Sequence, residues 1–237
     1  MSKLGFYMWA YANVESVDYI FDRLRKVYPE SEIYLSSDNG EDFSFMIEKY
    51  GLTYEHSKES HGPATKPHRY GWTAAESKLW LDRIYNACQT LSTDYIMLME
   101  EDILVKDKVR FPAVDIIMIP GWYNPICEDA MKWIGERGGK TDYPYYSAGG
   151  GTIIKRDTFI RAYDNWMSDF MRDYEDLYNK SMNAGCNGWG WNDSILAVLF
   201  YLENAKISTN LPITESGDED ANMPIIHKFK RLYRQKS

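Results

Sequence analysis

The sequence predicts an α/β fold: a mostly parallel central sheet flanked by helices, with a smaller and less regular lobe toward the C-terminus. Two observations support this prediction. Short apolar runs typical of buried strands alternate with stretches that carry apolar residues at helical spacing. Turn residues separate these segments, as expected for strand–helix–strand units. With 237 residues, the chain is long enough to bury a substantial core.

The first half of the chain supplies the parallel strands and the helices between them. Leu4–Tyr11 is predicted as the first strand, and the apolar stripe of Glu15–Tyr28 predicts the first helix, which Pro29 ends. Ser57–Trp72, rich in Gly, Pro and His, is predicted as a loop. The other strands predicted here are Glu32–Ser36, Leu52–Glu55 and Tyr95–Met99, and the other helices are Phe43–Tyr50 and Thr73–Thr90.

The second half is less regular. The strands predicted there are Val114–Ile119, Gly151–Lys155 and Lys206–Ser208, and the helices are Asp157–Met182 and Asp193–Glu203. The chain contains no internal repeat and no linker. We therefore expect one domain over residues 1–237, with one part at about 1–105 and a second at about 106–237.

Composition excludes several classes of protein. With 27 basic and 35 acidic residues the net charge is −8, which disfavours a generic nucleic-acid-binding protein. Three widely spaced cysteines without a CxxC pair disfavour a disulfide framework or a zinc site and suit a reducing compartment. No apolar run approaches the roughly 20 residues of a membrane span, and the apolar start is interpreted as a buried strand rather than a signal peptide. We expect a soluble, cytoplasmic protein.

Three acidic residues follow the strand Tyr95–Met99 directly. Ligands bind at the carboxyl ends of strands in open α/β sheets, so Glu100, Glu101 and Asp102 lie where a site is expected. Because side chains alternate along extended backbone, Glu100 and Asp102 share a side and can hold one Mg²⁺ or Mn²⁺ ion. A solvated acidic turn is the alternative interpretation.

A second motif combines glycines and tryptophans between Asn187 and Asp193. Glycines allow a ligand to approach the backbone closely, the tryptophans offer flat faces for stacking, and Asp193 offers a base. The structural alternative is that Asn192 or Asp193 caps the helix that follows, with the tryptophans in the core. Aromatic residues make up 15% of the chain, which suits either core packing or stacking on sugar and base rings.

Two further motifs lie in the second half. Three consecutive glycines end the stretch Tyr145–Gly151, and their backbone amides suit a phosphate or a sugar hydroxyl, with a flexible turn as the alternative. His227 is followed by Lys228 and Lys230, whose charges suit a diphosphate, with an exposed basic tail as the alternative. The sequence contains no GxGxxG, GxxxxGK[ST] or GxSxG motif, which disfavours dinucleotide oxidoreductases, P-loop NTPases and serine hydrolases.

Taken in order, these motifs resemble those of glycosyltransferases with the A-type (GT-A) fold. The acidic triplet Glu100-Glu101-Asp102 resembles their DxD metal motif in an E-x-D form, and His227 matches their C-terminal metal-ligand histidine. The stretch Gly188–Asp193 is similar to the Gly-Trp-Gly-Gly-Glu-Asp stretch of the inverting β-1,4-galactosyltransferases. Two departures are Glu100 in place of the first Asp and Asn192 in place of an acid. In build, the chain is closer to small soluble bacterial or large-DNA-virus transferases.

The resemblance implies a metal-dependent transfer of a sugar from a nucleotide-sugar donor, expected to be UDP-linked, to a hydroxyl of a glycan or glycoconjugate acceptor. It implies Mn²⁺ or Mg²⁺ bound by Glu100, Asp102 and His227, and Asp193 as the general base of an inverting reaction. The nucleotide or diphosphate contacts expected in the first part and the basic tail are Tyr11, Asn13, Asp38, Glu101, Lys228 and Lys230. The sugar or acceptor contacts expected in the second part are Tyr145, Tyr146, Gly149, Gly150, Gly151, Trp189, Trp191 and Asn192.

Other functions stay open at this point. A retaining glycosyltransferase on the same fold is compatible with the sequence, because the nucleophile of such enzymes is often not evident. A nucleotidyltransferase would need a glycine-rich phosphate loop, and Leu4–Asn13 offers only Gly5. A non-catalytic carbohydrate-binding module explains the aromatic residues but leaves the acidic triplet and His227 without a role.

Overall fold

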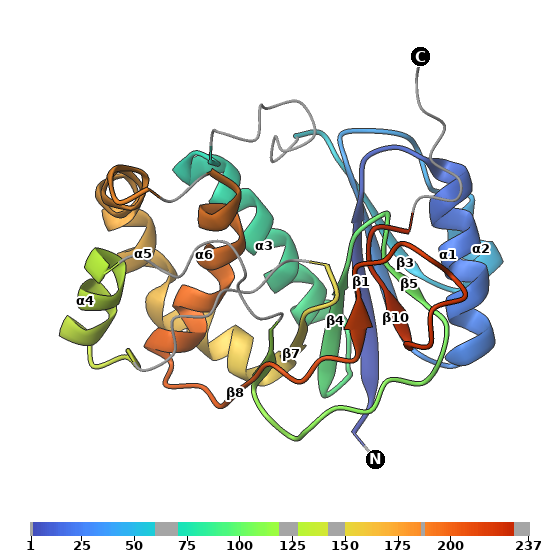
Figure 1. Cartoon of the computed structure of the whole chain (residues 1–237). Coiled ribbons are helices and arrows are strands. Elements are labelled where there is room, and N and C mark those ends of the chain that lie inside the picture. Colours follow the sequence, from blue (N-terminus) through green and yellow to red (C-terminus); the bar gives the residue numbers. More distant parts are fainter. Residues whose placement is uncertain (1, 60–70, 119–127, 142–149, 186–187, 230–237) are drawn as a thin grey trace.

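The computed structural model describes residues 2–59, 71–118, 128–141, 150–185 and 188–229. Its centre is a seven-stranded sheet of strand order β3-β2-β1-β4-β7-β6-β8 (Figure 1). The strands are β1 Leu4–Ala10, β2 Ile33–Asp38, β3 Thr53–Ser57, β4 Tyr95–Met99, β6 Ile116–Ile117, β7 Ile153–Lys155 and β8 Ile207–Ser208. Strands β3, β2, β1 and β4 run parallel, and β7 is antiparallel to both β4 and β6. The predicted mostly parallel α/β sheet is confirmed.

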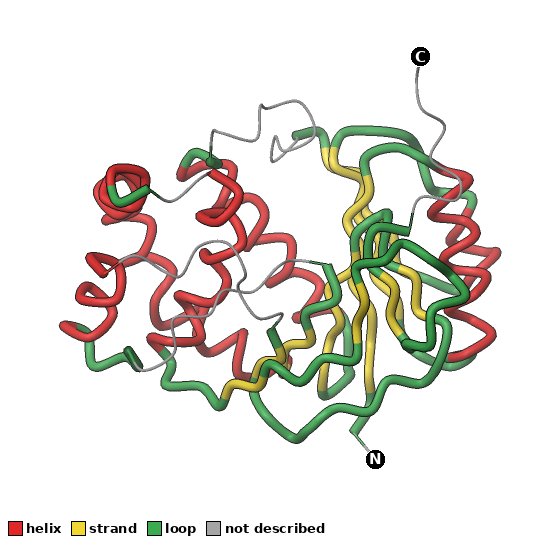
Figure 2. Tube along the Cα trace, in the orientation of Figure 1, coloured by secondary structure: helices red, strands yellow, loops and turns green. Residues whose placement is uncertain are grey.

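Helices cover both faces of this sheet (Figures 1 and 2). One face carries α1 Val14–Val27 and α2 Met46–Tyr50, and the other carries α3 Ala74–Thr90, α4 Glu128–Glu136, α5 Arg156–Asn183 and α6 Gly188–Leu202. Strand β1 serves both layers, because side chains alternate along it. Phe6 and Met8 pack in the cluster that contains α1, whereas Tyr7 packs in the cluster that contains α3.

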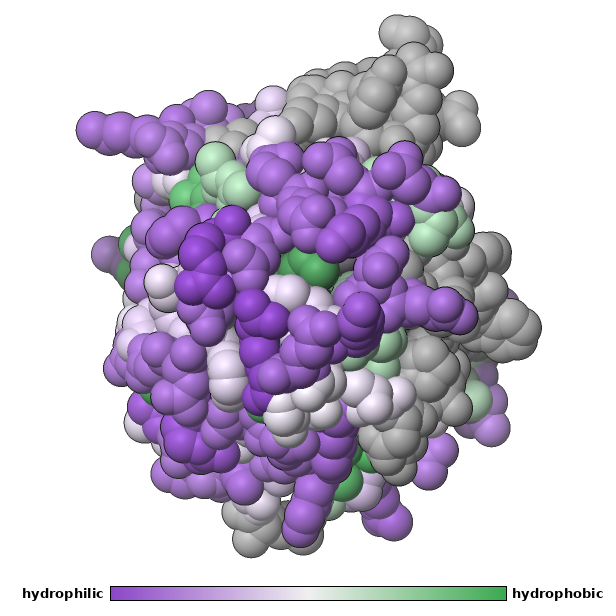
Figure 3. All heavy atoms as spheres, turned by 90° about the vertical axis from the view of Figure 1, so that its left-hand side faces the viewer, coloured by the Kyte–Doolittle hydropathy of each residue, from purple (hydrophilic) through white to green (hydrophobic). Residues whose placement is uncertain are grey.

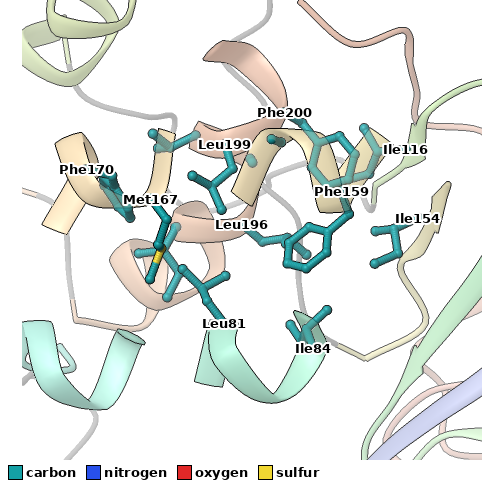
Figure 4. Packing of buried hydrophobic residues seen from close by; sticks show 14 of the residues in the cluster. Leu81, Ile84, Ile116, Ile154, Phe159, Met167, Phe170, Leu196, Leu199 and Phe200 are labelled. Carbon is teal, nitrogen blue, oxygen red and sulfur yellow. The ribbon is translucent and has the colours of Figure 1, made fainter. Parts of the chain in front are cut away.

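The helices α3, α5 and α6 are held to the sheet by apolar packing. Leu81 of α3, Phe159 of α5 and Leu196 of α6 are buried together with Ile154 of β7 (Figure 4). Burying each such side chain contributes about 1.5–3 kcal/mol. Seen from the side of α4 and α5, the molecular surface is mostly hydrophilic (Figure 3). Among the described residues, no helix combines the length and apolar character needed to cross a membrane.

A second, smaller sheet brings the C-terminal segment back to the end of β4. Its strands are β5 Leu104–Val105, β9 Ile213–Thr214 and β10 Ile225–Ile226. Strand β10 lies in the middle, antiparallel to β5 and parallel to β9. Both residues of β5 and both residues of β10 are fully buried, so this sheet is held by its side chains as well as by its few backbone hydrogen bonds.

Several elements differ from the sequence-based prediction. Helix α6 begins at Gly188, five positions before the predicted start, so neither Asn192 nor Asp193 caps it. Strand β6 comprises only Ile116–Ile117 of the longer strand predicted there. Helix α4 and the strands β5, β9 and β10 were not predicted. The predicted start of α3 is confirmed: the helix begins at Ala74, and its N-cap Thr73 forms a capping box with Glu76.

Candidate functional site

The candidate site lies at the carboxyl ends of β1 and β4, which are neighbours in the sheet. The chain leaves β1 toward β2 on one side, whereas β4 lies on the other side of β1, so the strand order changes direction here. Ligands of open α/β sheets bind in the crevice that forms at such a point. The turn Glu100–Asp102 follows β4 at this place.

Three predicted metal ligands converge at this edge. Glu100, Asp102 and His227 each present one ligand atom, and these atoms lie within 4.8 Å of one another. The His227 Nε2 and Asp102 Oδ1 atoms are 3.7 Å apart, and the two side chains are only 16% and 18% exposed. Two carboxylates and an imidazole this close form a set of donors that fits a divalent cation with open coordination positions.

The small sheet brings His227 to this cluster. His227 directly follows β10, and its backbone N–H donates to the Thr214 carbonyl of β9 over 2.8 Å. Two residues later, the Phe229 N–H donates to the Asp102 carbonyl over 2.9 Å. The backbone around the histidine is therefore tied both to β9 and to the turn that carries the carboxylates.

Glycines at the start of β7 allow that strand to lie against the turn. A Cβ atom on Gly150 would lie 3.0 Å from the Ile103 side chain and 3.2 Å from Glu100 Cδ, so a larger residue would press on a metal ligand. Gly151 has φ +89°, which favours glycine. Its N–H donates to the Leu98 carbonyl over 2.7 Å, so this amide serves the sheet and is not open to a ligand.

Glu101 contacts the connection between β1 and α1. Its carboxylate accepts hydrogen bonds from the backbone N–H groups of Tyr11 and Ala12 (2.5 Å for Ala12) and from the Asn13 side-chain amide (2.9 Å). Burial raises the pKa of the Glu101 carboxyl, and these three hydrogen bonds act in the opposite direction. The structure thus brings Glu101, Tyr11 and Asn13 together, beside the metal cluster.

The Tyr11 backbone is also held from its other side. Its carbonyl accepts the Glu41 N–H over 2.8 Å, and a Cβ atom on Gly40 would lie 1.6 Å from the Tyr11 oxygen, so only glycine fits at position 40. The Tyr11 side chain remains 39% exposed. Sequence reasoning missed that Gly40 supports the candidate site.

Comparisons with solved structures show which known fold this architecture resembles. No protein-family model and no curated protein matches the chain. An active-site mutant of LgtC matches with a TM-score of 0.53 and 12% identity, over 94% of this chain and 86% of that one. The galactosyltransferase LgtC in complex with donor and acceptor sugar analogues matches with a TM-score of 0.50 and 10% identity over the same shares. TarS of S. aureus matches with a TM-score of 0.50 and 11% identity, over 97% of this chain but only 38% of TarS.

The chain has the GT-A fold. The fold class expected from the resemblance is therefore confirmed, and its sheet edge carries the acidic turn and the histidine as expected. At these identities the likeness concerns the fold alone, and the activity of the chain is a separate question.

On this GT-A sheet, Asp38 does not line the crevice as expected. It is 3% exposed and forms a buried ion pair with Arg83 of α3. Arg83 also donates to Ser57 Oγ over 2.7 Å and to the Glu59 carbonyl, so the pair joins the ends of β2 and β3 to α3. In the sequence, an acidic residue at the end of a strand suggests a contact with a ligand. The sequence does not reveal the ion pair, because Arg83 lies on a helix far along the chain.

Lys228 lies beside the metal cluster. It is exposed, has φ 62°, and pairs with Glu215 over 2.8 Å between Nζ and Oε2. The other basic residue expected here, Lys230, lies outside the described residues.

Of the residues expected to contact the sugar or acceptor, some have a structural role and others lie outside the described part of the chain. Trp191 is 2% exposed and donates from Nε1 to Tyr174 Oη over 2.7 Å, so it belongs to the core and offers no face to a sugar. Asn192 Oδ1 accepts the Trp72 N–H over 2.8 Å. Trp189 and Asp193 lie in α6, but their side chains are outside the described part, as are Tyr145, Tyr146 and Gly149 altogether.

Proposed function

We propose that the chain is a metal-dependent glycosyltransferase that moves a sugar from a nucleotide-sugar donor to a hydroxyl of a glycan or glycoconjugate. The observation that carries this proposal is the convergence of Glu100, Asp102 and His227 at the crevice of a GT-A fold. The likeness in fold to LgtC, a galactosyltransferase seen with donor and acceptor sugar analogues, supports it. UDP is proposed as the nucleotide from the resemblance to the β-1,4-galactosyltransferases.

We propose Mn²⁺ or Mg²⁺ as the ion, held by Glu100, Asp102 and His227. Carboxylates suit both ions, and the imidazole nitrogen favours Mn²⁺. When bound, the ion supplies positive charge to the diphosphate that leaves. Lys228 lies next to His227 in the chain and adds a second charge there once its ammonium group turns from Glu215 to the diphosphate.

The 11–13 loop, residues Tyr11 to Asn13, is proposed to receive the nucleoside. The exposed Tyr11 ring offers a flat face for a base, and the loop lies next to the turn that carries the metal ligands. Asp38 leaves this set because its carboxylate is used by Arg83. The residues still proposed for the sugar and acceptor side are Tyr145, Tyr146, Gly149, Gly150, Trp189 and Asn192.

We propose Asp193 as the general base of an inverting reaction. Its carboxylate takes the proton of the acceptor hydroxyl while that oxygen forms a bond to the anomeric carbon. The bond from this carbon to the diphosphate oxygen breaks, and its electron pair leaves with the nucleoside diphosphate. Attack from the face opposite the leaving group inverts the anomeric centre. NMR of the anomeric configuration of the product separates this reaction from a retaining one.

Calorimetric titration of UDP with and without Mn²⁺ tests the proposal. We expect Mn²⁺ to tighten UDP binding at least about tenfold. The positive charge of a bound ion would attract the diphosphate of UDP. His227→Ala should lose this enhancement, whereas His56→Ala, which removes an exposed histidine of β3, should keep it. No UDP binding in either condition contradicts the proposal and favours a carbohydrate-binding module. A screen of nucleotide-sugars scored by slow hydrolysis then identifies the donor.

A further inference from the structure

Glu101 stands between two metal ligands in the sequence, yet its hydrogen bonds go to the segment that follows β1. The carboxylate accepts hydrogen bonds from the N–H groups of Tyr11 and Ala12 and from the Asn13 amide. Its backbone carbonyl accepts a hydrogen bond from Ser16 Oγ of α1 over 3.2 Å. Side chain and backbone of one residue therefore join the turn that carries the metal ligands to the loop and helix that follow β1.

The same contacts place a negative charge at the N-terminus of α1. Asn13, the residue that precedes this helix, has φ 58° and makes no side-chain cap, and its side-chain N–H donates to Glu101. A helix N-terminus favours an anion, and in many α/β proteins this position binds a phosphate. Here the carboxylate of Glu101 lies just before this helix, on the N–H groups of Tyr11 and Ala12. A diphosphate placed at the α1 N-terminus would meet this like charge, whereas one placed at the metal cluster would meet the positive charge of a bound ion, which offsets the carboxylates of Glu100 and Asp102.

We propose that Glu101 is a positioning residue that fixes the 11–13 loop relative to the metal ligands and directs the donor diphosphate away from the α1 N-terminus. This inference rests on the proposed function, since the loop and the cluster are taken to hold two parts of one donor. Through Glu101, the loop that receives the nucleoside and the turn that binds the ion move as one unit. Metal binding and nucleoside binding are then coupled.

Three variants test this role. Glu101→Ala removes the acceptor, and Glu101→Gln keeps an oxygen for the two backbone N–H groups while the Asn13 amide turns over to keep its partner. Glu41→Ala is the matched control. It removes an exposed acid whose residue contacts the same loop only through its backbone N–H. Three quantities are measured: amide hydrogen exchange at Tyr11 and Ala12, affinity for Mn²⁺ alone, and affinity for UDP with Mn²⁺.

For Glu101→Ala, we expect exchange at Tyr11 and Ala12 to become about 10- to 100-fold faster and UDP affinity to fall about tenfold, as expected for hydrogen bonds to a charged group. Affinity for Mn²⁺ alone should fall clearly less than in Asp102→Asn, since the metal ligands are the neighbouring side chains. Glu101→Gln should recover most of both losses, and Glu41→Ala should behave as the wild type.

The outcomes separate this inference from the proposed function. A wild-type chain that binds no UDP, with faster exchange in Glu101→Ala, overturns the proposed function alone. Unchanged exchange, or a loss of Mn²⁺ affinity as large as that of Asp102→Asn, overturns the positioning role. If Glu101→Ala does not fold, Asn13→Gly takes its place, because glycine keeps the φ of 58° and removes only the amide donor. Unchanged affinity for UDP with Mn²⁺ in that variant overturns the role as well.

Discussion

The two sheets of the molecule contribute to one site by different means. Strands β1 to β4 are five to seven residues long and alternate with helices along the chain. The strands of the small sheet have two residues each and come from distant parts of the sequence. The large sheet places the turn Glu100–Asp102, and the small sheet adds His227 to it. A regular framework thus gives the location of the site, and a minor element completes its ligand set.

The largest expected effect comes from a residue of the helical layer. Asp193→Asn should lower sugar transfer at least about 10³-fold, because the acceptor hydroxyl loses its base. Binding of UDP with Mn²⁺ should not change, since the metal and nucleoside contacts lie on the sheets. Turnover is measured with the donor found by hydrolysis screening, and binding by calorimetry. Asp176→Asn, which replaces an exposed aspartate of α5, is the control. Normal turnover by Asp193→Asn contradicts its assignment as the base.

A second prediction tests whether Asp102, placed by the large sheet, and His227, placed by the small sheet, bind the same ion. Asp102→Asn and His227→Ala should each lower Mn²⁺ affinity by about 100-fold or more, since even residues that only support metal ligands cost 10–100-fold. The double variant should lose little beyond either single one, because groups that act as a unit are not additive. Electron paramagnetic resonance of free Mn²⁺ measures the three affinities. Losses that simply add would mean that the two residues do not share an ion.

A third prediction separates stability from metal binding. Ile226 of β10 and Ile33 of β2 are both buried, and replacing either with Ala should lower the free energy of unfolding by about 2–5 kcal/mol. Only Ile226→Ala should also weaken Mn²⁺ binding, because β10 positions His227. Denaturant unfolding and metal titration give the two quantities. Equal Mn²⁺ affinity in the two variants would show that His227 keeps its place without the packing of β10.

The contrast between the sheets also explains what the sequence could predict. Local signals were sufficient for the strand–helix alternation and for the start of α3 after Thr73. A strand of two residues is too short to show a hydrophobic periodicity, so β5, β9 and β10 could not be predicted from the sequence. Helix α6 begins at Gly188 against the low helix propensity of glycine; the buried Trp191 and its bond to Tyr174 give a tertiary reason.

The same limit applies to the site. The set Glu100, Asp102 and His227 came from an ordered series of motifs, and the alternation of side chains was enough to separate Glu101 from its neighbours. The sequence could not identify the hydrogen-bond and ion-pair partners of Glu101 and Asp38. Each lies on another element far along the chain, and nothing in the local pattern of an acidic residue tells a ligand contact from an internal ion pair.

The smallest expected effect concerns the edge of the large sheet away from the site. Asp115 precedes β6; burial raises its pKa, but hydrogen bonds from the Lys206 N–H (2.8 Å) and the Thr158 hydroxyl (2.9 Å), with Lys155, outweigh this and lower it. Because the pKa is lower in the folded state, the carboxylate stabilises the fold above its unfolded pKa of about 3.9. This contribution is lost as pH falls through the folded pKa.

Asp115→Asn should therefore lower the free energy of unfolding at neutral pH by on the order of 1 kcal/mol, and this difference from the wild type should shrink below about pH 4. Asp107→Asn, at an exposed position, should show no such pattern. If the difference in unfolding free energy between Asp115→Asn and the wild type does not change with pH, the Asp115 side chain stabilises the fold by packing and hydrogen bonding rather than by its charge. Mn²⁺ affinity should be unchanged in Asp115→Asn, because β6 and β8 lie at the opposite side of β7 from the metal turn. That result would confine the coupling between stability and metal binding to the small sheet.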